Sequence, residues 1–192
     1  VLSALKDGTF GMARETADFI NSAVSEGVIG GRGLGESLGL KIEREPLKFK
    51  ELSIAFACFK KKIPLTVHVA IGTDIIHQHA SFSGAYTGEA SARDFRKFTE
   101  VVAKLGSGGV VVNIGSAVIL PEVFLKALSV ARNLTGKVEC FTTVNMDMNF
   151  HYRPFQNIVS RPVAGSGRGY YLIGHHEIML PLLAQAVIDR IR

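Results

Sequence analysis

Four short apolar runs alternate with segments of helical periodicity, and this alternation constrains the fold more than any other feature. The runs are rich in β-branched residues and bounded by Gly or Pro, and they span residues 63–72, 108–117, 137–147 and 167–177. Strands that alternate with helices are typical of a parallel sheet joined by right-handed crossovers. The sequence therefore predicts an α/β fold with a doubly wound, mostly parallel, Rossmann-like sheet.

The connecting segments carry recognisable helix signals. In "SARDFRKFTEVVAKLG", Ser91 stands in the N-cap position, Asp94 in the capping-box position, and Gly106 at the end of the apolar pattern. In "LPEVFLKALSVARNL", Pro121 falls in the first turn, where it needs no hydrogen-bond partner. We expect one helix to begin at Ser91 and another near Pro121.

The bulk composition favours one globular domain over residues 1–192. Of the 192 residues, 47% are hydrophobic and 20% are charged, which is enough apolar material for a proper core. The net charge is +5, but the basic residues are scattered apart from the cluster Lys60–Lys62. A nucleic-acid interface has a longer basic stripe interleaved with aromatic residues, so we expect no nucleic-acid partner.

Three features that the sequence lacks predict where in the cell the protein is located. No apolar run reaches about 18 residues, and no signal-peptide pattern precedes the first helix, so we expect no membrane association. Cys58 and Cys140 lack metal-ligand spacing and are typical of thiols in a reducing compartment, which predicts a cytoplasmic protein. The chain opens without an initiator Met, so we expect it to be the C-terminal portion of a longer protein.

Polar or small residues end every one of the four apolar runs. In an open parallel sheet, ligands bind at the carboxyl ends of the strands, so these residues predict one shared pocket. The candidates for binding a cofactor or another small-molecule or nucleotide ligand are Gly72, Thr73, Asp74, Asn113, Gly115, Ser116, Thr143, His175 and His176. The candidates for acid–base catalysis are His77, Asp147 and Glu177.

The stretch "NIGSAVILPEVF" predicts an anion-binding turn. Gly115, Ser116 and Ala117 are small enough for a ligand to approach the backbone closely. The helix expected near Pro121 directs its free N–H groups at the same place, which favours a phosphate group.

The histidines raise the alternative of a metal-dependent hydrolase. Such a site would use His77 and His79 with Asp74 or Glu89, and the neighbouring pair His175 and His176. Neither an HExxH motif nor a cysteine pair supports zinc, so we expect no metal. His77, beyond the strand end, is better suited to hydrogen bonding or acid–base work.

From Ile63 to the C-terminus, the ordered segments resemble deoxyhypusine synthase, an NAD-dependent enzyme that transfers an aminobutyl group from spermidine to a protein lysine. Four segments carry the resemblance: "IPLTVHVAIGTDIIHQH", "GGVVVNIGSAVILPEVF", "CFTTVN" and "YLIGHHEIMLPLLAQAVI". They are similar, in order, to the family's Ile-Pro strand, the strand leading into Gly-Gly-Gly-Val-Val-Lys-His-His, the Asn-Thr-Ala-Gln strand end, and the final strand with its Pro-Leu-Leu helix.

The resemblance implies NAD as cofactor, a transferase-like activity and a homo-oligomer, with a tetramer as in the family. Aligned without a gap, the lysine of the glycine-rich segment falls on Leu120, which cannot form an imine. We therefore expect a homologue without the catalytic lysine, one that binds NAD or a related nucleotide without true deoxyhypusine synthase activity. The alternative from another class is a non-catalytic, oligomeric assembly protein of the same fold.

Overall fold

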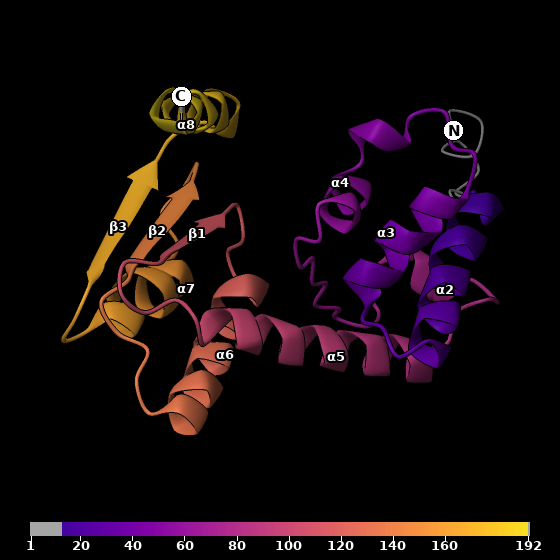
Figure 1. Cartoon of the computed structure of the whole chain (residues 1–192), viewed down its shortest axis with the longest axis horizontal. Coiled ribbons are helices and arrows are strands. Elements are labelled where there is room, and N and C mark those ends of the chain that lie inside the picture. The colour runs from indigo at the N-terminus through magenta and orange to yellow at the C-terminus, as the bar shows by residue number, and fades with distance from the viewer. Residues whose placement is uncertain (1–12, 192) are drawn as a thin grey trace. The chain divides into compact units, whose positions relative to one another are not determined.

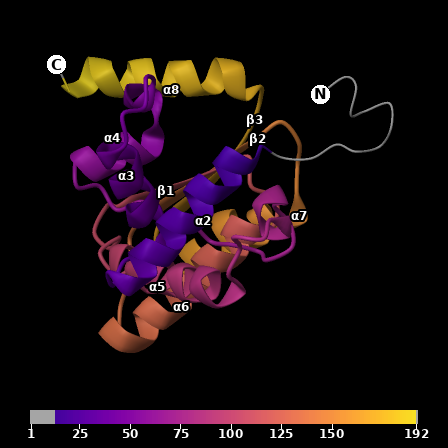
Figure 2. The same cartoon turned by 90° about the vertical axis from the view of Figure 1, so that its right-hand side faces the viewer.

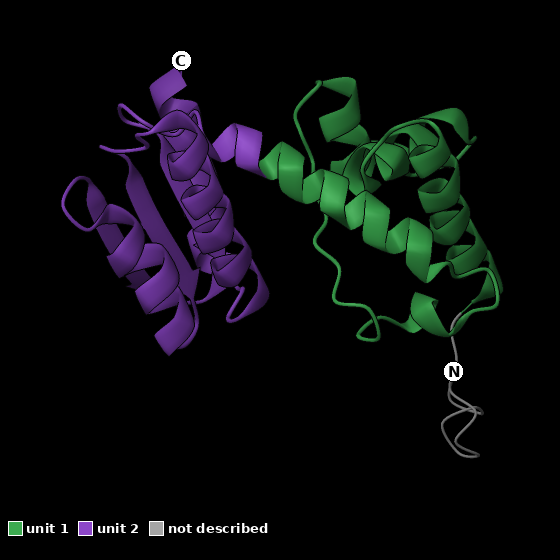
Figure 3. Ribbon diagram, turned by 90° about the horizontal axis from the view of Figure 1, so that it is seen from below, with its two compact units in different colours: residues 1–98 green, residues 99–192 purple. Residues whose placement is uncertain are grey.

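The computed structural model describes residues 13–191, drawn in Figure 1. This part of the chain divides into two compact units, unit 1 up to Phe98 and unit 2 from Thr99 onward (Figure 3). The division falls within helix α5 (Gly84–Val102). The prediction of a single domain stays a prediction. Within residues 13–191, no helix combines the length and apolar character needed to cross a membrane.

Unit 1 is helical. Helix α2 packs against α3, and α3 packs against α4 (Figures 1 and 2). The elements before α5 are α2 (Arg14–Ile29), α3 (Leu34–Arg44), the 3₁₀ turn η1 (Lys50–Leu52), α4 (Ile54–Lys60) and the 3₁₀ turn η2 (Ile75–Gln78). Its core joins buried Val24, Leu34 and Ala90, and the half-buried Val67 and Val69 pack against them.

The predicted strand over residues 63–72 does not form: residues 63–70 lie in no helix or strand, and residues 71 and 72 form a turn. Side chains of α5 take the place of a neighbouring strand. The backbone N–H of Val67 donates to Asp94 Oδ2 at 2.8 Å, and that of Val69 donates to Ser91 Oγ at 3.1 Å. The prediction of a strand here is wrong because helix side chains satisfy these peptide groups.

The same contacts correct the predicted start of α5. The helix begins at Gly84, so Ser91 and Asp94 lie inside it and not at its N-terminus. Asp94 Oδ2 also accepts the backbone N–H of Gly35 at 2.9 Å. The N-cap of helix α3 is Gly33, which has no side chain to accept a hydrogen bond from the first turn. Asp94 therefore caps a helix distant in sequence, which supplies the partner that the α3 terminus lacks.

Unit 2 is an α/β unit with a three-stranded parallel sheet in the order β1-β2-β3. The strands are β1 (Val110–Ile114), β2 (Thr142–Asp147) and β3 (Arg168–Ile173). Helix α6 (Ile119–Thr135) connects β1 to β2. The short α7 (Tyr152–Pro154), the π-helical turn η3 (Phe155–Ser160) and the 3₁₀ turn η4 (Arg161–Val163) connect β2 to β3. Three of the four predicted strands are thus confirmed, and among the described strands the order follows the chain without a reversal.

One face of this sheet is packed against helices. Turn η3 contacts both β2 and β3, and it also contacts α6. Asn113, Thr143, Asn145 and Asp147 are buried on this face. Alternation along the strands puts polar side chains on the helix-covered side, which is unusual for a parallel sheet.

The opposite face, here called the outer face, is apolar. In register across the strands it carries Val110, Val112 and Ile114 of β1 with Tyr170 and Leu172 of β3. These five side chains are between 38% and 58% exposed, whereas Met146 of the central strand is buried on the same face. Helix α8 (His176–Ile191) follows β3 and lies beyond the ends of β2 and β3 (Figure 1). It has no buried residue.

Candidate functional site

The carboxyl ends of β1, β2 and β3 meet at one edge of the sheet. The backbone N–H of Gly115 donates to the Met146 carbonyl at 3.0 Å, and that of Gly174 donates to the Asp147 carbonyl at 3.0 Å. These two bonds extend the parallel pairing just past the strand ends. The candidate residues that follow the three strands are therefore brought to the same edge, as the sequence predicts for unit 2.

Two buried asparagines link β1 and β2 at this edge. Asn113 Nδ2 donates to Asn145 Oδ1 at 2.6 Å and to the Ser116 carbonyl at 2.9 Å. Asn145 is fully buried, yet its own Nδ2 has no hydrogen-bond partner, and neither does Thr143 Oγ1. An unpaired buried polar group costs about 1–3 kcal/mol, so such groups call for an explanation such as a ligand or a water molecule.

The turn after β1 approaches the start of α8. Gly115 has a φ of +63°, and a Cβ built on it would lie 3.3 Å from His176 Nε2. His176 Nδ1 is buried without a hydrogen-bond partner. Ser116 Oγ accepts the backbone N–H of Leu120 at 3.2 Å, which fixes the turn on the first residues of α6. The position therefore favours glycine for its backbone conformation and for the space that His176 occupies.

Asp147 ends β2 and faces a histidine that sequence reasoning missed. Its side chain is 9% exposed, and its Oδ1 lies 3.6 Å from His151 Nε2. Tyr171 fixes the intervening loop, because its hydroxyl accepts the His151 N–H at 2.8 Å and donates to the Asn149 carbonyl at 2.9 Å. A buried carboxylate beside a histidine is an arrangement able to hold and move a proton.

Glu122 adds a charged group in the first turn of α6. It pairs with Lys126, accepts the Asn157 amide at 2.8 Å, and lies 3.5 Å from Arg153 Nε. The hydrogen bond from Lys126 is the main reason that the pKa of Glu122 lies below its ordinary value, and Asn157 and Arg153 act in the same direction. The N-terminus of α6 therefore carries the Glu122 carboxylate, which forms ion pairs with Lys126 and Arg153.

The remaining unit 2 candidates lie where α8 begins. The His175 carbonyl accepts the backbone N–H groups of Ile178 at 3.1 Å and Met179 at 3.0 Å, so it opens the helix. Glu177 is exposed in the first turn, where a negative charge interacts favourably with the helix dipole.

The candidates in unit 1 come together in a single turn. The N–H groups of Gly72 and Asp74 both donate to His77 Nδ1, at 3.0 and 3.3 Å. Asp74 Oδ1 in return accepts the N–H of Ile76 at 3.2 Å, and Thr73 Oγ1 donates to the Ala70 carbonyl at 2.7 Å. Asp74 and His77 therefore form a capping box for η2, and His77 Nδ1 is occupied by backbone donors.

The second histidine of this segment has separate partners. His79 Nδ1 lies 2.8 Å from Ser81 Oγ and 3.5 Å from Asp18 Oδ1. In the part of the chain that the structure describes, no three His, Cys, Asp or Glu side chains are grouped so that they could hold a metal ion.

Comparison with known proteins does not extend this description. No protein-family model, curated protein or solved structure matches the chain.

Proposed function

We propose that this chain binds NAD or a related nucleotide at the carboxyl edge of β1–β3, as a Rossmann-like, deoxyhypusine synthase-like protein. The main support for the proposal is the buried side-chain amide of Asn145, whose Nδ2 has no hydrogen-bond partner. Asn113 connects this amide to the turn after β1, because its Nδ2 donates to both Asn145 Oδ1 and the Ser116 carbonyl. A ligand oxygen at this edge would satisfy that donor and remove its desolvation cost.

The side chains at the edge fit the functional groups of a nucleotide. Gly115 gives the turn its positive φ, and α6 starts directly after the turn, as in nucleotide-binding sheets. Asp147 ends the strand that follows this first helix, and an acid at that position binds ribose hydroxyls in dinucleotide-binding sheets. NAD, when bound, supplies hydride transfer.

The proposal assigns acid–base work to groups of this chain. We assign it to Asp147 and His151, whose Oδ1 and Nε2 atoms lie 3.6 Å apart at this edge, and to Glu177, which is exposed in the first turn of α8. A transferase-like reaction without true deoxyhypusine synthase activity and a homo-oligomer belong to the same proposal, because both follow from the resemblance. A cytoplasmic location, which the two cysteines predict, is proposed with them.

Thermal unfolding with NAD, ADP-ribose or no ligand tests the proposal. A nucleotide at 100 times its dissociation constant should raise the free energy of unfolding by about 2.7 kcal/mol. The variant Gly115→Ala should abolish this stabilisation, since its Cβ would crowd His176 at the proposed site.

Gly136→Ala is the matched control. Gly136 also has a positive φ, of +83°, but has no atom within 4 Å of the added Cβ, and it lies at the other end of α6. This variant should lose intrinsic stability like Gly115→Ala and keep the response to nucleotide. An equal response in both variants would remove the Gly115 turn as the binding site, and no response in the unmodified protein would favour the assembly-protein alternative.

A further inference from the structure

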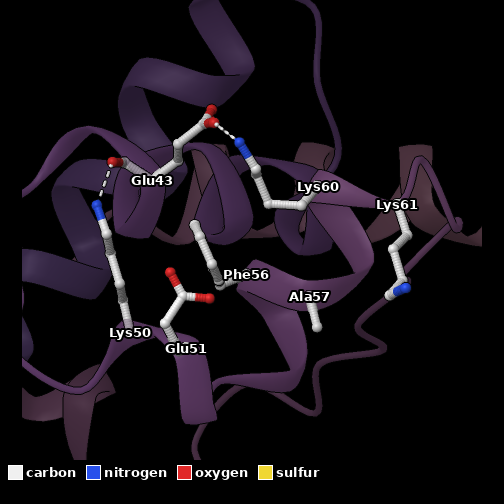
Figure 4. Close-up of a pocket in the computed structure, with 7 residues that line it drawn as sticks. All are labelled: Glu43, Lys50, Glu51, Phe56, Ala57, Lys60 and Lys61. Carbon is white, nitrogen blue, oxygen red and sulfur yellow. Dashed lines mark hydrogen bonds and ion pairs between the residues drawn. The ribbon is translucent and has the colours of Figure 1, made fainter.

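Unit 1 contains a hollow that the proposed nucleotide site does not use. It measures about 620 Å³ and lies between the end of α3, the turn η1 and α4 (Figure 4). Phe56 and Ala57 give it an apolar side, and Phe56 is itself only 6% exposed. The volume is within the range of protein pockets that enclose a small ligand or an anchoring side chain.

Lysines surround this hollow, and two of them are held in place. Lys50 Nζ donates to the Glu43 and Glu45 carbonyls at 3.0 and 3.4 Å and lies 5.6 Å from the centre of the Phe56 ring. Lys60 Nζ lies 3.1 Å from Glu43 Oε1. The charge of Lys50 is therefore positioned by neutral carbonyls and is not cancelled by a carboxylate.

The third lysine, Lys61, has no ion pair with any other described residue, and Figure 4 shows it at the edge of the hollow. Between residues 43 and 62 the chain has six basic side chains and three acidic ones. Of the residues that line the hollow, three are lysines and two are glutamates, so the lining carries a small excess of positive charge.

Large apolar side chains lie exposed in the same stretch. Leu52 is 83% exposed, Ile54 75% and Phe49 66%. Leu52 and Ile54 fall between the lining residues Glu51 and Phe56 in the sequence. Three large apolar side chains exposed within six positions of the chain are candidates for contact with a partner.

We propose that this surface, formed by residues 43–61, binds an acidic amphipathic peptide segment of a partner protein. An apolar side chain of the peptide would enter the hollow over Phe56, and its carboxylates would pair with Lys50 and Lys61. A phosphate backbone would leave Leu52 and Ile54 in water, and a flat bilayer would not fill a concave hollow. An acidic amphipathic peptide covers both the charged and the apolar groups.

Fluorescence anisotropy of the full chain with a labelled 14-residue peptide tests this inference. The peptide has Leu or Phe at positions i, i+3, i+4 and i+7 and Asp or Glu elsewhere. It should bind, and more weakly as salt rises. Replacement of its acids by Asn and Gln, or of its apolar residues by Ser, should each abolish binding.

Two substitutions should change the affinity in opposite directions. Lys61→Glu should weaken binding about fivefold, in line with the reversal of an exposed charge. Glu51→Gln should strengthen it, because Glu51 is the lining carboxylate with no cation paired to it among the described residues. Lys137→Glu makes the same charge change at an exposed lysine of unit 2 and should have no effect.

The result can overturn the inference in two ways. Equal affinity of the Lys61→Glu and Lys137→Glu proteins, or no binding of the peptide at all, removes the assigned surface. Tighter binding to vesicles of phosphatidylcholine and phosphatidylserine (4:1), or to a 20-nucleotide single strand, than to the peptide assigns it to a different class of partner. Circular dichroism of each variant confirms that the fold is intact.

Discussion

The side-chain amide of Asn113 donates to Asn145 Oδ1 across 2.6 Å and so ties β1 to β2 beneath the turn that follows β1. Both residues are 5% exposed or less, and they lie directly opposite each other in the strand register. The bond therefore acts inside the sheet layer, where an unmade polar contact is expensive.

Removing either amide should destabilise unit 2. Asn113→Ala leaves Asn145 Oδ1 and the Ser116 carbonyl without their donor, and Asn145→Ala leaves the Asn113 amide with one bond fewer. We expect each to lower the free energy of unfolding by about 1–3 kcal/mol. Urea unfolding of both single variants and the double variant measures the coupling, which should be at least 0.5 kcal/mol. Strict additivity would show that the bond contributes nothing beyond its two ends.

Asp94 should be among the most sensitive positions in unit 1. Its carboxylate accepts the backbone N–H groups of Gly35 and Val67, and it is 3% exposed. Asp94→Ala leaves both donors buried and removes the cap of α3, so we expect a loss of about 2–4 kcal/mol in the free energy of unfolding. Asp94→Asn keeps one acceptor oxygen and should lose clearly less. Equal losses in chemical denaturation would contradict this capping role.

The pH dependence of stability should carry a contribution from His68. Burial lowers the pKa of this ring below 6.5, and the nearby Asp94 opposes the shift. As the pH falls below 6.5, the unfolded ring takes up a proton that the folded ring resists, so the free energy of unfolding falls. The stability that His68 contributes is therefore full above pH 6.5 and is lost as the pH falls from 6.5 through the lowered pKa of the folded protein. His68→Gln should therefore flatten the stability profile between pH 7.5 and 5.5 in urea titrations.

Asp94 should act with the opposite sign. Burial raises its pKa above 3.8, and the backbone donors Gly35 and Val67 reduce the shift. The folded protein thus binds the proton more tightly than the unfolded chain, so this contribution is full below pH 3.8 and is lost as the pH rises through the raised pKa. Asp94→Asn should remove that decline from the acid part of the profile. An unchanged acid limb would exclude Asp94 as its source.

Two glycine substitutions should have opposite effects on stability. A Cβ on Gly169 of β3 would lie 1.9 Å from the Val159 carbonyl oxygen, so backbone must move to admit it. We expect Gly169→Ala to lower the free energy of unfolding by about 2–3 kcal/mol. Gly88, inside α5, has no atom within 4 Å of an added Cβ. Gly88→Ala should raise stability by about 0.5–1 kcal/mol, and thermal melts of the two proteins compare them directly.

The sequence predicted the sheet of unit 2 well, because each strand there combines β-branched residues with turn residues at its end. It failed at residues 63–72, where the same pattern forms neither a strand nor a helix. The reason is tertiary: Ser91 and Asp94 hold the backbone of this segment. These two residues match an N-cap and a capping box in the sequence, so the local signal gave the wrong helix start.

The candidate site was predictable only in part. Strand ends identify Asn113, Gly115 and Asp147, because parallel strands finish at one edge. No local spacing identifies His151 or Tyr171, which meet through a hydroxyl–backbone bond across 20 positions of sequence. Contacts of this kind depend on how a loop returns to the next strand, and neither composition nor periodicity encodes that path.

Substitutions on the outer face of the sheet in unit 2 should affect the protein differently from substitutions in its core. Side chains such as Val112, 39% exposed, and Tyr170, 46% exposed, keep part of their contact with water, so exchanging them for polar residues gives up less burial than the same change in the core. Natural variants or engineered changes at these positions are thus expected to alter solubility and self-association well before they alter folding. A screen that scores only thermal melting would overlook them, whereas light scattering would not.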